Sequence, residues 1–442
     1  MFSKKLSRRN FLRMVSAAGG SAMLAASGIP RVFAAGSGAQ ATTSLEIIGF
    51  SLDDVHQQAL NLFATAHPEI KVTWTPVPGG WPEMLAKMNT RIAAGDPPDM
   101  VAVATYGPPL NWSKTGLLTD LNTLISSDAD FAKQPIAQGL LDDYTREGKL
   151  FGLPKDYVPH AVIYNKTIFE KAGVEPPQDG WTWADVVEKA KALTSGDGAD
   201  KVFGWLTPTG PWEYEQYLWA NDGPGFFNRK TGDFNTPTAN DPKNIEALQW
   251  LADTILVDGI SPSAEQLSAQ DSGSRQLSGK LAMWSSSTID TVALLKNSDK
   301  IDWQVVPMPR AYKGGPLASV MWTSGFGMVS STKHPEEVWS FLKHMSIGAG
   351  ARVLGTTGFS IPAGVPDAFL SPEMIAHGGQ IFVDATKADI VYTDGLGINH
   401  DEIVSQVIVP DSQAAFLGQM SAADALGQIQ QGMEDILAQN SS

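Results

Sequence analysis

The chain has 442 residues, a formal net charge of −15 and no cysteine. The lack of cysteine excludes disulfides, thiolate metal sites, a cysteine nucleophile and a lipid-modified cysteine. A strongly acidic surface repels phosphate backbones, so we expect no nucleic acid among the partners. Beyond the amino terminus, no stretch of the sequence approaches the roughly 20 consecutive apolar residues that a membrane helix needs.

The amino terminus has the pattern of an export signal. Arg8 and Arg9 stand in a Ser-Arg-Arg-x-Phe-Leu setting, and an uncharged stretch from Met14 to Pro30 follows. Val32-Phe33-Ala34 then offers small residues for cleavage after Ala34. The paired arginines indicate the twin-arginine route, which carries folded proteins. We therefore expect export by the twin-arginine translocase and a location in the periplasm.

The next part of the chain alternates short apolar runs with helical patterns. The runs Leu45–Phe50, Ile70–Thr75 and Met100–Ala104 are typical of strands. Between them, apolar residues recur at helical spacing from Val55 to Ala66 and from Met84 to Ile92. Strands and helices that alternate at this spacing predict a parallel sheet covered by helices.

The alternation resumes after Gly152-Leu153-Pro154 and predicts a second α/β unit. Its expected elements are strands at Ala161–Tyr164, Val202–Leu206, Leu281–Trp284 and Trp303–Val306, and helices at Ala184–Leu193, Tyr214–Ala220 and Asn244–Leu256. About 400 residues remain after the signal, which is enough for two domains with cores of their own.

No motif with specific spacing indicates catalysis. The sequence has no phosphate-cradling loop, no G-x-S-x-G elbow, no H-E-x-x-H and no complete dinucleotide fingerprint. The seven histidines are scattered, so we expect no metal site and no cofactor. Adjacent carboxylates such as Asp53 and Asp54 keep one alternative open, because glycosidases use a pair of carboxyl groups.

Aromatic residues are abundant in segments that read as loops. Of the thirteen tryptophans, Trp81 lies in a Pro-Gly-Gly-Trp-Pro segment and Trp212 follows Gly210-Pro211. A sugar ring offers apolar faces to aromatic rings and hydroxyl groups to carboxylates. The run Trp212-Glu213-Tyr214 provides both kinds of group at one place, although packing in the core is the alternative for each ring.

Several stretches together resemble extracellular solute-binding protein family 1, which includes maltose-binding protein. Each motif is weak alone, but they follow the family's order over nearly the whole chain. They are Ala93–Asp99 (AAGDPPD), Gly116–Leu121 (GLLTDL), Gly148–Pro154 (GKLFGLP), Ile163–Lys166 (IYNK), Phe169–Val174 (FEKAGV), Trp181–Asp185 (WTWAD), Gly279–Met283 (GKLAM) and His334–Trp339 (HPEEVW).

The resemblance implies an α/β, two-lobed periplasmic-binding-protein fold of type II. Each lobe would be a mainly parallel sheet flanked by helices, with hinge strands between the lobes. Crossings are expected near Lys155–His160, Val306-Pro307 and Met345–Gly348. The implied division is a signal at 1–34, a flexible linker at 35–43, a first lobe at 44–156 with the returning segment 307–346, and a second lobe at 157–306 with the C-terminal helical segment 347–442.

The resemblance also implies a function. The chain would be a monomeric periplasmic component of an ABC importer that binds a mono- or oligosaccharide between its lobes and delivers it to the membrane permease. The third-strand loop, Ala104-Thr105-Tyr106-Gly107, lacks the charged pair of the maltose binder, so maltose is not expected. The positions implied to line the cleft are Asp53, Asp54, Trp81, Tyr106, Asp156, Tyr157, Trp212, Glu213, Tyr214, Trp284 and Trp322.

Two alternatives remain beside this reading. One is a periplasmic carbohydrate-active enzyme. The other is a binding protein for a non-sugar polar solute such as a polyamine or a glycerol phosphate ester. A phosphate ligand would require arginines in the cleft, and the candidates Arg275, Arg310 and Arg352 are poorly placed for this. Asp53 and Asp54 are compatible with a cationic ligand as well as with sugar hydroxyls.

Overall fold

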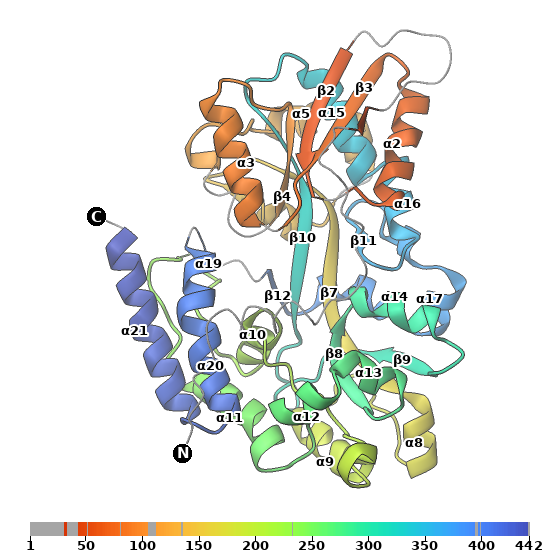
Figure 1. Cartoon of the computed structure of the whole chain (residues 1–442), viewed down its shortest axis with the longest axis vertical. Coiled ribbons are helices and arrows are strands. Elements are labelled where there is room, and N and C mark those ends of the chain that lie inside the picture. The colour runs from red at the N-terminus through yellow and green to blue at the C-terminus, as the bar shows by residue number, and fades with distance from the viewer. Residues whose placement is uncertain are drawn as a thin grey trace, which may run out of the picture.

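The chain forms two lobes, one above the other in Figure 1, with long strands running between them. We call the upper one lobe 1 and the lower one lobe 2. The computed structural model describes residues 31–32, 43–50, 52–79, 81–104, 112–133, 136–231, 233–393, 397 and 399–440. Within these ranges, no helix combines the length and the apolar character that crossing a membrane requires.

Lobe 1 is built around three parallel strands. β2 (Thr43–Gly49) lies between β3 (Ile70–Pro76) and β4 (Met100–Ala104) and is parallel to both. The predicted β-α-β-α-β unit is confirmed, with α2 (Asp54–Ala66) and α3 (Trp81–Ala93) as its helices. Parallel strands bring their carboxyl ends to one edge of a sheet. In lobe 1 this edge faces lobe 2 (Figure 1).

Smaller elements complete lobe 1. They are β1 (Arg31–Val32), α5 (Asn122–Ser127), α6 (Ala129–Lys133), α7 (Gln138–Asp142), β5 (Thr145–Arg146), β6 (Lys149–Leu150), α15 (Pro335–Ser346) and α16 (Ala349–Gly355). The two residues of β1 pair with β3, whereas the rest of the predicted signal lies outside the described residues. Because α16 packs against α2, the chain is still in lobe 1 beyond the crossing expected near Met345–Gly348.

Two strands connect the lobes. The upper part of β10 (Ala318–Met328) is antiparallel to β4, and its middle is antiparallel to β7 (Leu153–Asn165). The lower part of β7 is antiparallel to β8 (Met283–Ser287) and β9 (Trp303–Val306) of lobe 2. The first crossing therefore falls in β7, near its expected place. The next one runs along β10 and not at Val306-Pro307, because the segment between β9 and β10 is bound within lobe 2 by the backbone of Trp183.

Between β7 and β9, the described residues form seven α-helices of lobe 2. They are α8 (Lys166–Ala172), α9 (Trp183–Leu193), α10 (Pro211–Ala220), α11 (Pro242–Leu256), α12 (Ala264–Ala269), α13 (Ser272–Leu277) and α14 (Thr288–Lys296). β8 and β9 are both antiparallel to β7, since each returns toward the hinge that β7 leaves. The predicted strand Val202–Leu206 forms only isolated bridges, which are parallel from Phe203 to Leu281 and from Leu206 to Trp284 and antiparallel from Val202 to Ser195. The expected mainly parallel sheet is thus realised in lobe 1 and not in lobe 2.

The C-terminal part returns along the hinge and then covers lobe 2. Its elements are β11 (Ile361–Pro362), α17 (Pro372–Ala376), α18 (Gln380–Asp384), β12 (Ile390–Thr393), α19 (His400–Ile403), a π-helical turn (Val404–Ile408), α20 (Val409–Phe416) and α21 (Ala422–Asn440), with short 3-10 turns at Pro366–Phe369 and Ala385–Lys387. A further 3-10 turn, Gly198–Asp200, lies between α9 and α10. β11 pairs with β7 and β12 with β10, while α21 packs on α11 and α20.

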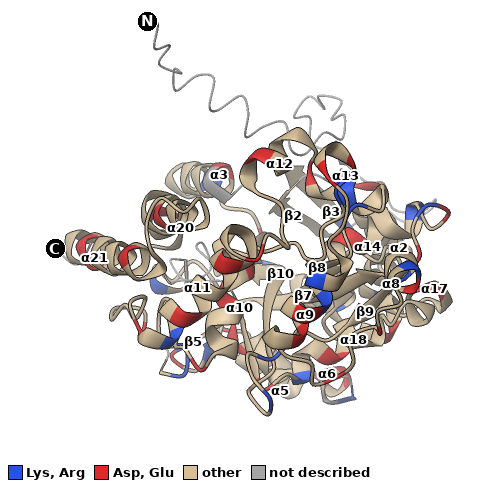
Figure 2. Cartoon of the chain, turned by 90° about the horizontal axis from the view of Figure 1, so that it is seen from below, with Lys and Arg blue, Asp and Glu red and all other residues tan. Residues whose placement is uncertain are grey.

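Strand alternation divides the core into two clusters. In β7, Ile163 packs into a cluster that continues upward into lobe 1, whereas Val162 and Tyr164 face a second cluster that fills the rest of lobe 2. Successive side chains of a strand point to opposite faces, so one strand contributes to both cores. Seen from below, Asp and Glu are spread over many elements and form no single acidic face (Figure 2).

The hinge pairing leads to a prediction about Gly325. An alanine Cβ there would lie 2.2 Å from the carbonyl oxygen of Leu153, across the bulge where β10 meets β7. We expect Gly325→Ala to lower the free energy of unfolding by about 1–3 kcal/mol, the usual cost of overpacking. Thermal and denaturant melts measure this. Gly427→Ala in α21 is the control, because no atom apart from its chain neighbours and the helix's own backbone lies within 4 Å of its Cβ. It should stabilise the chain by about 0.5–1 kcal/mol.

Candidate functional site

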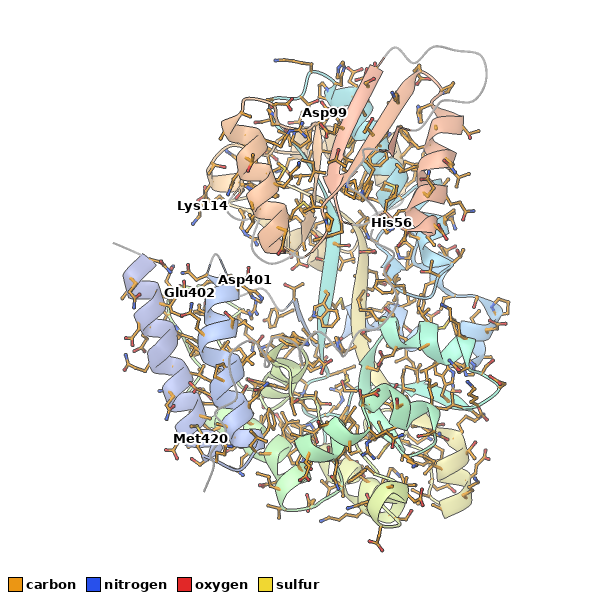
Figure 3. The ribbon with its side chains drawn as sticks, viewed as in Figure 1. His56, Asp99, Lys114, Asp401, Glu402 and Met420 are labelled. Carbon is orange, nitrogen blue, oxygen red and sulfur yellow. The ribbon has the colours of Figure 1, made fainter. Side chains whose placement is uncertain are left out.

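The edge of lobe 1 that faces lobe 2 begins with Asp53, the N-cap of α2. One carboxylate oxygen accepts hydrogen bonds from the backbone of Val55 (3.1 Å) and from the backbone and ring of His56 (both 2.8 Å). Partial burial opposes ionisation, but these bonds outweigh it and lower the pKa of Asp53 to about 2. Asp54 follows in the first turn and is exposed. Figure 3 places His56 on the side of lobe 1 nearest the junction.

Of the other two predicted residues of lobe 1, the structure describes only the position of Trp81. Trp81 is the first residue of α3, which follows the carboxyl end of β3. Tyr106 follows β4 and lies outside the described residues. The parallel strands therefore bring the starts of α2 and α3 to the surface that faces lobe 2.

The hinge carries Asp156 and Tyr157, and both side chains are buried. Asp156 forms an ion pair with Lys155 and accepts hydrogen bonds from Ser324 of β10 and from Ser360, just before β11. Burial would raise the pKa of Asp156, but Lys155 and the serines hold it below its usual value. Tyr157 pairs with β10 and β11, and burial raises its pKa. The Asp156 carboxylate thus joins three segments of the hinge.

In lobe 2 the predicted aromatic residues divide into exposed and buried ones. Trp212, in the first turn of α10, is 41% exposed, whereas Tyr214 is 0% exposed and packs edge-on to Phe226 and Phe416. Residues two apart on a helix point in very different directions, so these rings cannot share one surface. Trp284 is also fully buried, within the core.

Trp322 differs from these rings in its position at the hinge. It lies in β10 opposite Val158 of β7, half-buried, and its ring stands edge-on to His160 at 5.1 Å. Full burial keeps His160 uncharged by lowering its pKa to about 4. The pair is thus an uncharged aromatic contact at the point where the strands pass between the lobes.

A second carboxyl group accompanies Glu213 in lobe 2. Asp290 lies in the first turn of α14 and accepts a 2.7 Å hydrogen bond from Ser286 at the end of β8. Burial raises the pKa of Glu213 to about 7, and the nearby charge of Asp290 contributes. Burial also raises the pKa of Asp290, against hydrogen bonds from Ser286 and Gln276. Sequence reasoning missed Asp290. Ser287, three residues before it, is the N-cap of α14, and an acidic residue in the first turn of a capped helix needs no functional explanation.

A further exposed ring, Phe359, was also missed by sequence reasoning. It is 48% exposed, and its backbone carbonyl accepts a 2.7 Å hydrogen bond from Thr288 at the start of α14. The next residue, Ser360, binds Asp156, so the segment is held between α14 and the hinge. The only sequence feature that could have indicated an exposed ring at Phe359 is its position directly after Gly358 in a turn.

Exposed aromatic residues and carboxyl groups of lobe 2 and the hinge are the polar and apolar groups that the described surface offers. The exposed Trp212 lies in a helix whose first turn also holds Glu213, and the exposed Phe359 is followed by Ser360, which binds the hinge carboxylate of Asp156. Within the described ranges, no group of three or more His, Asp or Glu side chains is placed to hold a metal ion. What the surface offers is aromatic faces and hydrogen-bond acceptors.

Two α/β lobes joined by shared strands, with rings and carboxyl groups gathered at the joint, define a two-lobed binding protein. The model of the bacterial extracellular solute-binding protein family matches residues 52–346. The chain belongs to this family. The family is one of extracellular proteins, so its members act in the periplasm or outside the cell.

Individual relatives agree with this family. A binding protein of Brucella abortus is 25% identical over 290 residues, which cover 65% of this chain and 67% of the relative. An arabinooligosaccharide-binding protein of Halalkalibacterium halodurans is 27% identical over 229 residues, 50% of this chain and 49% of the relative. Among solved structures, an ABC substrate-binding protein from Listeria monocytogenes in complex with cycloalternan superposes with a TM-score of 0.75 at 23% identity, over 90% of this chain and 99% of that one. The two-lobed fold is confirmed.

Asp156 gives a prediction for stability. Asp156→Asn leaves the buried ammonium group of Lys155 without its partner, so we expect a loss of about 3–5 kcal/mol in unfolding free energy near neutral pH. A carboxyl group with a lowered folded pKa stabilises the fold above its unfolded pKa and ceases to do so as pH falls through the folded pKa. The wild type should therefore lose this contribution below about pH 4, and the variant should show a flatter acid limb.

Chemical denaturation across pH measures both effects. Asp367→Asn is the control, because Asp367 pairs with Arg352 on the surface, where the two side chains are 69% and 52% exposed. Such a pair contributes less than about 1 kcal/mol. An Asp156→Asn variant as stable as Asp367→Asn would contradict the role assigned to Asp156.

Proposed function

We propose that this chain is the periplasmic solute-binding component of an ABC importer and that it binds a sugar or oligosaccharide in a cleft between its lobes. One observation carries the proposal. Trp212, which is exposed, is followed by Glu213 in the first turn of α10, and the backbone carbonyl of the exposed Phe359 accepts a hydrogen bond from Thr288, two residues before Asp290 in α14. Ring and carboxyl together match the apolar faces and hydroxyl rim of a sugar.

The named relatives support the same class of ligand. One is an arabinooligosaccharide-binding protein, and the solved structure from Listeria monocytogenes holds cycloalternan. On this proposal, the starts of α2 and α3 provide the lobe-1 wall, with Asp53, Asp54, Trp81 and Tyr106. Trp212, Glu213 and Trp322 belong to the other wall. Tyr214 and Trp284 are fully buried, so on this proposal they do not contact the ligand and instead pack behind the residues that do.

The hinge supplies the motion that such a site needs. β7 and β10 pass from one lobe to the other, so bending near their midpoint would change the angle between the lobes. A ligand shifts that equilibrium only by its preference for the closed form, which contacts on both walls provide. The closed, loaded form would then dock to the permease.

Binding without turnover is favoured over a glycosidase. A glycosidase places its two carboxyl groups on either side of the scissile bond. Glu213 and Asp290 come from the same lobe and act on each other electrostatically. This arrangement favours one wall of a binding site over two opposed catalytic groups.

The twin-arginine route is part of the proposal and has its own test. Replacing Arg8 and Arg9 by lysine should leave the precursor in the cytoplasm, because the translocase reads the arginine pair and not charge alone. Cell fractionation followed by immunoblotting measures this. Lys4→Arg with Lys5→Arg is the matched control, which should be exported normally. Full periplasmic recovery of the lysine variant, including in a strain without the translocase, would rule this route out.

Trp212 tests the binding surface. A thermal-shift screen against neutral mono- and oligosaccharides first identifies a ligand, since a ligand that binds only the folded state raises the melting temperature. Trp212→Ala should then cost about 2–4 kcal/mol of binding, as aromatic hot spots do. At about 1.4 kcal/mol per tenfold, this is roughly 30- to 700-fold in affinity by calorimetry.

The control for this variant is Leu417→Ala. Leu417 ends α20 and is 49% exposed, so its truncation also removes exposed apolar surface. It should leave affinity unchanged, and neither variant should shift the melting temperature of the ligand-free protein by much. If Trp212→Ala unfolds early while keeping full affinity, the ring is a packing residue and the site lies elsewhere.

A further inference from the structure

A pocket opens in lobe 2 at the carboxyl end of α10, whereas Trp212 lies in the first turn of that helix. The pocket holds about 800 Å³ of empty space, including its open mouth. Small-molecule sites have roughly 300–1,000 Å³. Its walls come from the end of α10, the loop after α10, the start of α11 and β12. Because these segments all belong to lobe 2, the pocket is formed without closure of the two lobes.

The strands β10 and β12 separate this pocket from the surface around Trp212. Trp219, which lines the pocket, follows Trp212 by seven residues, so it lies on the same face about 10 Å further along the helix axis. Between them, Gln216 is 1% exposed, and its amide oxygen accepts a 3.3 Å hydrogen bond from the backbone of Val320 in β10. Tyr392 of β12 pairs with the same residue of β10. A ligand on Trp212 therefore cannot follow α10 into the pocket, and the two places are distinct.

Two aromatic rings form adjacent walls of the pocket. The rings of Trp219 and Tyr392 stand edge-on, with 5.2 Å between their centroids. Trp219 is 1% exposed, whereas Tyr392 is half-buried. The ring that a ligand can cover is therefore that of Tyr392. Such a ring suits the apolar face of a sugar.

The polar groups of the lining include donors and acceptors whose charges are largely matched. Arg229 forms an ion pair with Glu215 at 3.4 Å, and the two side chains are 5% and 2% exposed. Asp222 accepts a hydrogen bond from the hydroxyl of Tyr312, and Asp241 caps the start of α11. This lining gives an ion of either sign little advantage. Donors and acceptors around an aromatic face fit a neutral molecule with several hydroxyl groups.

The side chain of Asn244 in α11 holds the segments around the pocket in place. Asn244 is 0% exposed, accepts a hydrogen bond from the backbone of Gly225 (3.2 Å) and donates to the carbonyls of Gly225 (2.8 Å) and Thr238 (2.9 Å). A Cβ added at Gly223 would lie 2.3 Å from the side-chain oxygen of Asn244, so the loop fits closely against α11. A pocket that is already formed reduces the ordering cost of binding.

We propose that this pocket is a second saccharide site, separate from the cleft between the lobes, and that it binds a neutral sugar unit over the ring of Tyr392. Lys230, an exposed residue of the lining, supplies an ammonium group that donates to sugar hydroxyls. The inference goes beyond the proposed function, because a cleft between the lobes would serve uptake without a second site.

Calorimetry on the Trp212→Ala variant of the mature chain tests the pocket, because this change weakens binding in the cleft. The probes are neutral mono- and disaccharides that include glucose, arabinose and maltose, with glucuronate and glucosamine as charged counterparts of glucose. We expect at least one neutral probe to bind at a one-to-one ratio, and neither charged probe to bind more tightly than glucose. Small-angle X-ray scattering should show an unchanged radius of gyration on binding, because the pocket lies within one lobe.

Two further changes assign that binding to the pocket. In the Trp212→Ala background, Tyr392→Ala removes the exposed ring and Lys230→Ala removes the donor, and each should weaken binding by about tenfold, the effect of losing one good contact. Lys333→Ala is the control, because Lys333 is an exposed residue beyond the end of β10 in lobe 1 and its loss changes the net charge as Lys230→Ala does. Melting curves check folding, and the exposed Lys230 keeps the test decisive if Tyr392→Ala is unstable.

The outcomes separate this inference from the proposed function. If saccharides bind the wild type but not Trp212→Ala, or if Tyr392→Ala and Lys230→Ala leave the residual binding intact, the pocket is not a saccharide site and the proposed function stands. Tighter binding of glucuronate or glucosamine than of glucose contradicts the neutral ligand class. If Tyr392→Ala alone abolishes all binding to the otherwise wild-type chain, the second site stands and the cleft proposal fails.

Discussion

The pairing of β7 with β10 is the constraint on which the rest of the structure depends. β7 has thirteen consecutive residues. Its first part pairs with β10 toward lobe 1, and its last part pairs with β8 in lobe 2. The bulge between Ser324 and Gly325, where only glycine fits against the backbone of β7, fixes the register at the middle. Because both strands are extended through this point, the faces of the two lobes that approach each other are set by the same few residues.

Polar side chains from several segments stabilise the middle of the β7–β10 pair. Asp156 binds Lys155, Ser324 and Ser360, which belong to β7, β10 and the segment before β11. On the lobe-1 side, Asp143 accepts hydrogen bonds from Thr323 of β10 (3.2 Å) and Thr393 of β12 (3.1 Å), and burial raises its pKa to about 7. Buried polar groups are costly unless they are paired, so these side chains specify one arrangement of the hinge segments.

The sequence predicted the parallel part of the fold best. β2, β3, β4 and their helices could be predicted from local periodicity, because the spacing of apolar residues along each segment matches the face that the segment buries. The hinge was predicted from family resemblance and only partly in place, because a strand shared by two lobes looks like any apolar run. Val202–Leu206 has the composition of a strand, yet its neighbours provide only isolated bridges.

The candidate site was predicted unevenly for similar reasons. Trp212 and Glu213 stood out because an aromatic and an acidic residue follow Gly-Pro at the start of a helix. Tyr214 shares that composition, but helix geometry turns it into the core. Asp290 and Phe359 lie on segments far apart in the chain, and only the tertiary structure brings the start of α14 against the turn at Phe359. Sequence spacing carries no information on such meetings.

The alternation of β7 between two cores has a consequence for how the protein unfolds. Ile163 packs with one cluster of buried side chains and Val162 with the other, so the strand cannot leave one cluster without disturbing its neighbour. A lobe excised from the chain would lose half of a strand that its own sheet requires. The two lobes should therefore behave as a single cooperative unit, and their boundary marks an axis of rotation and not a border between independently folding domains.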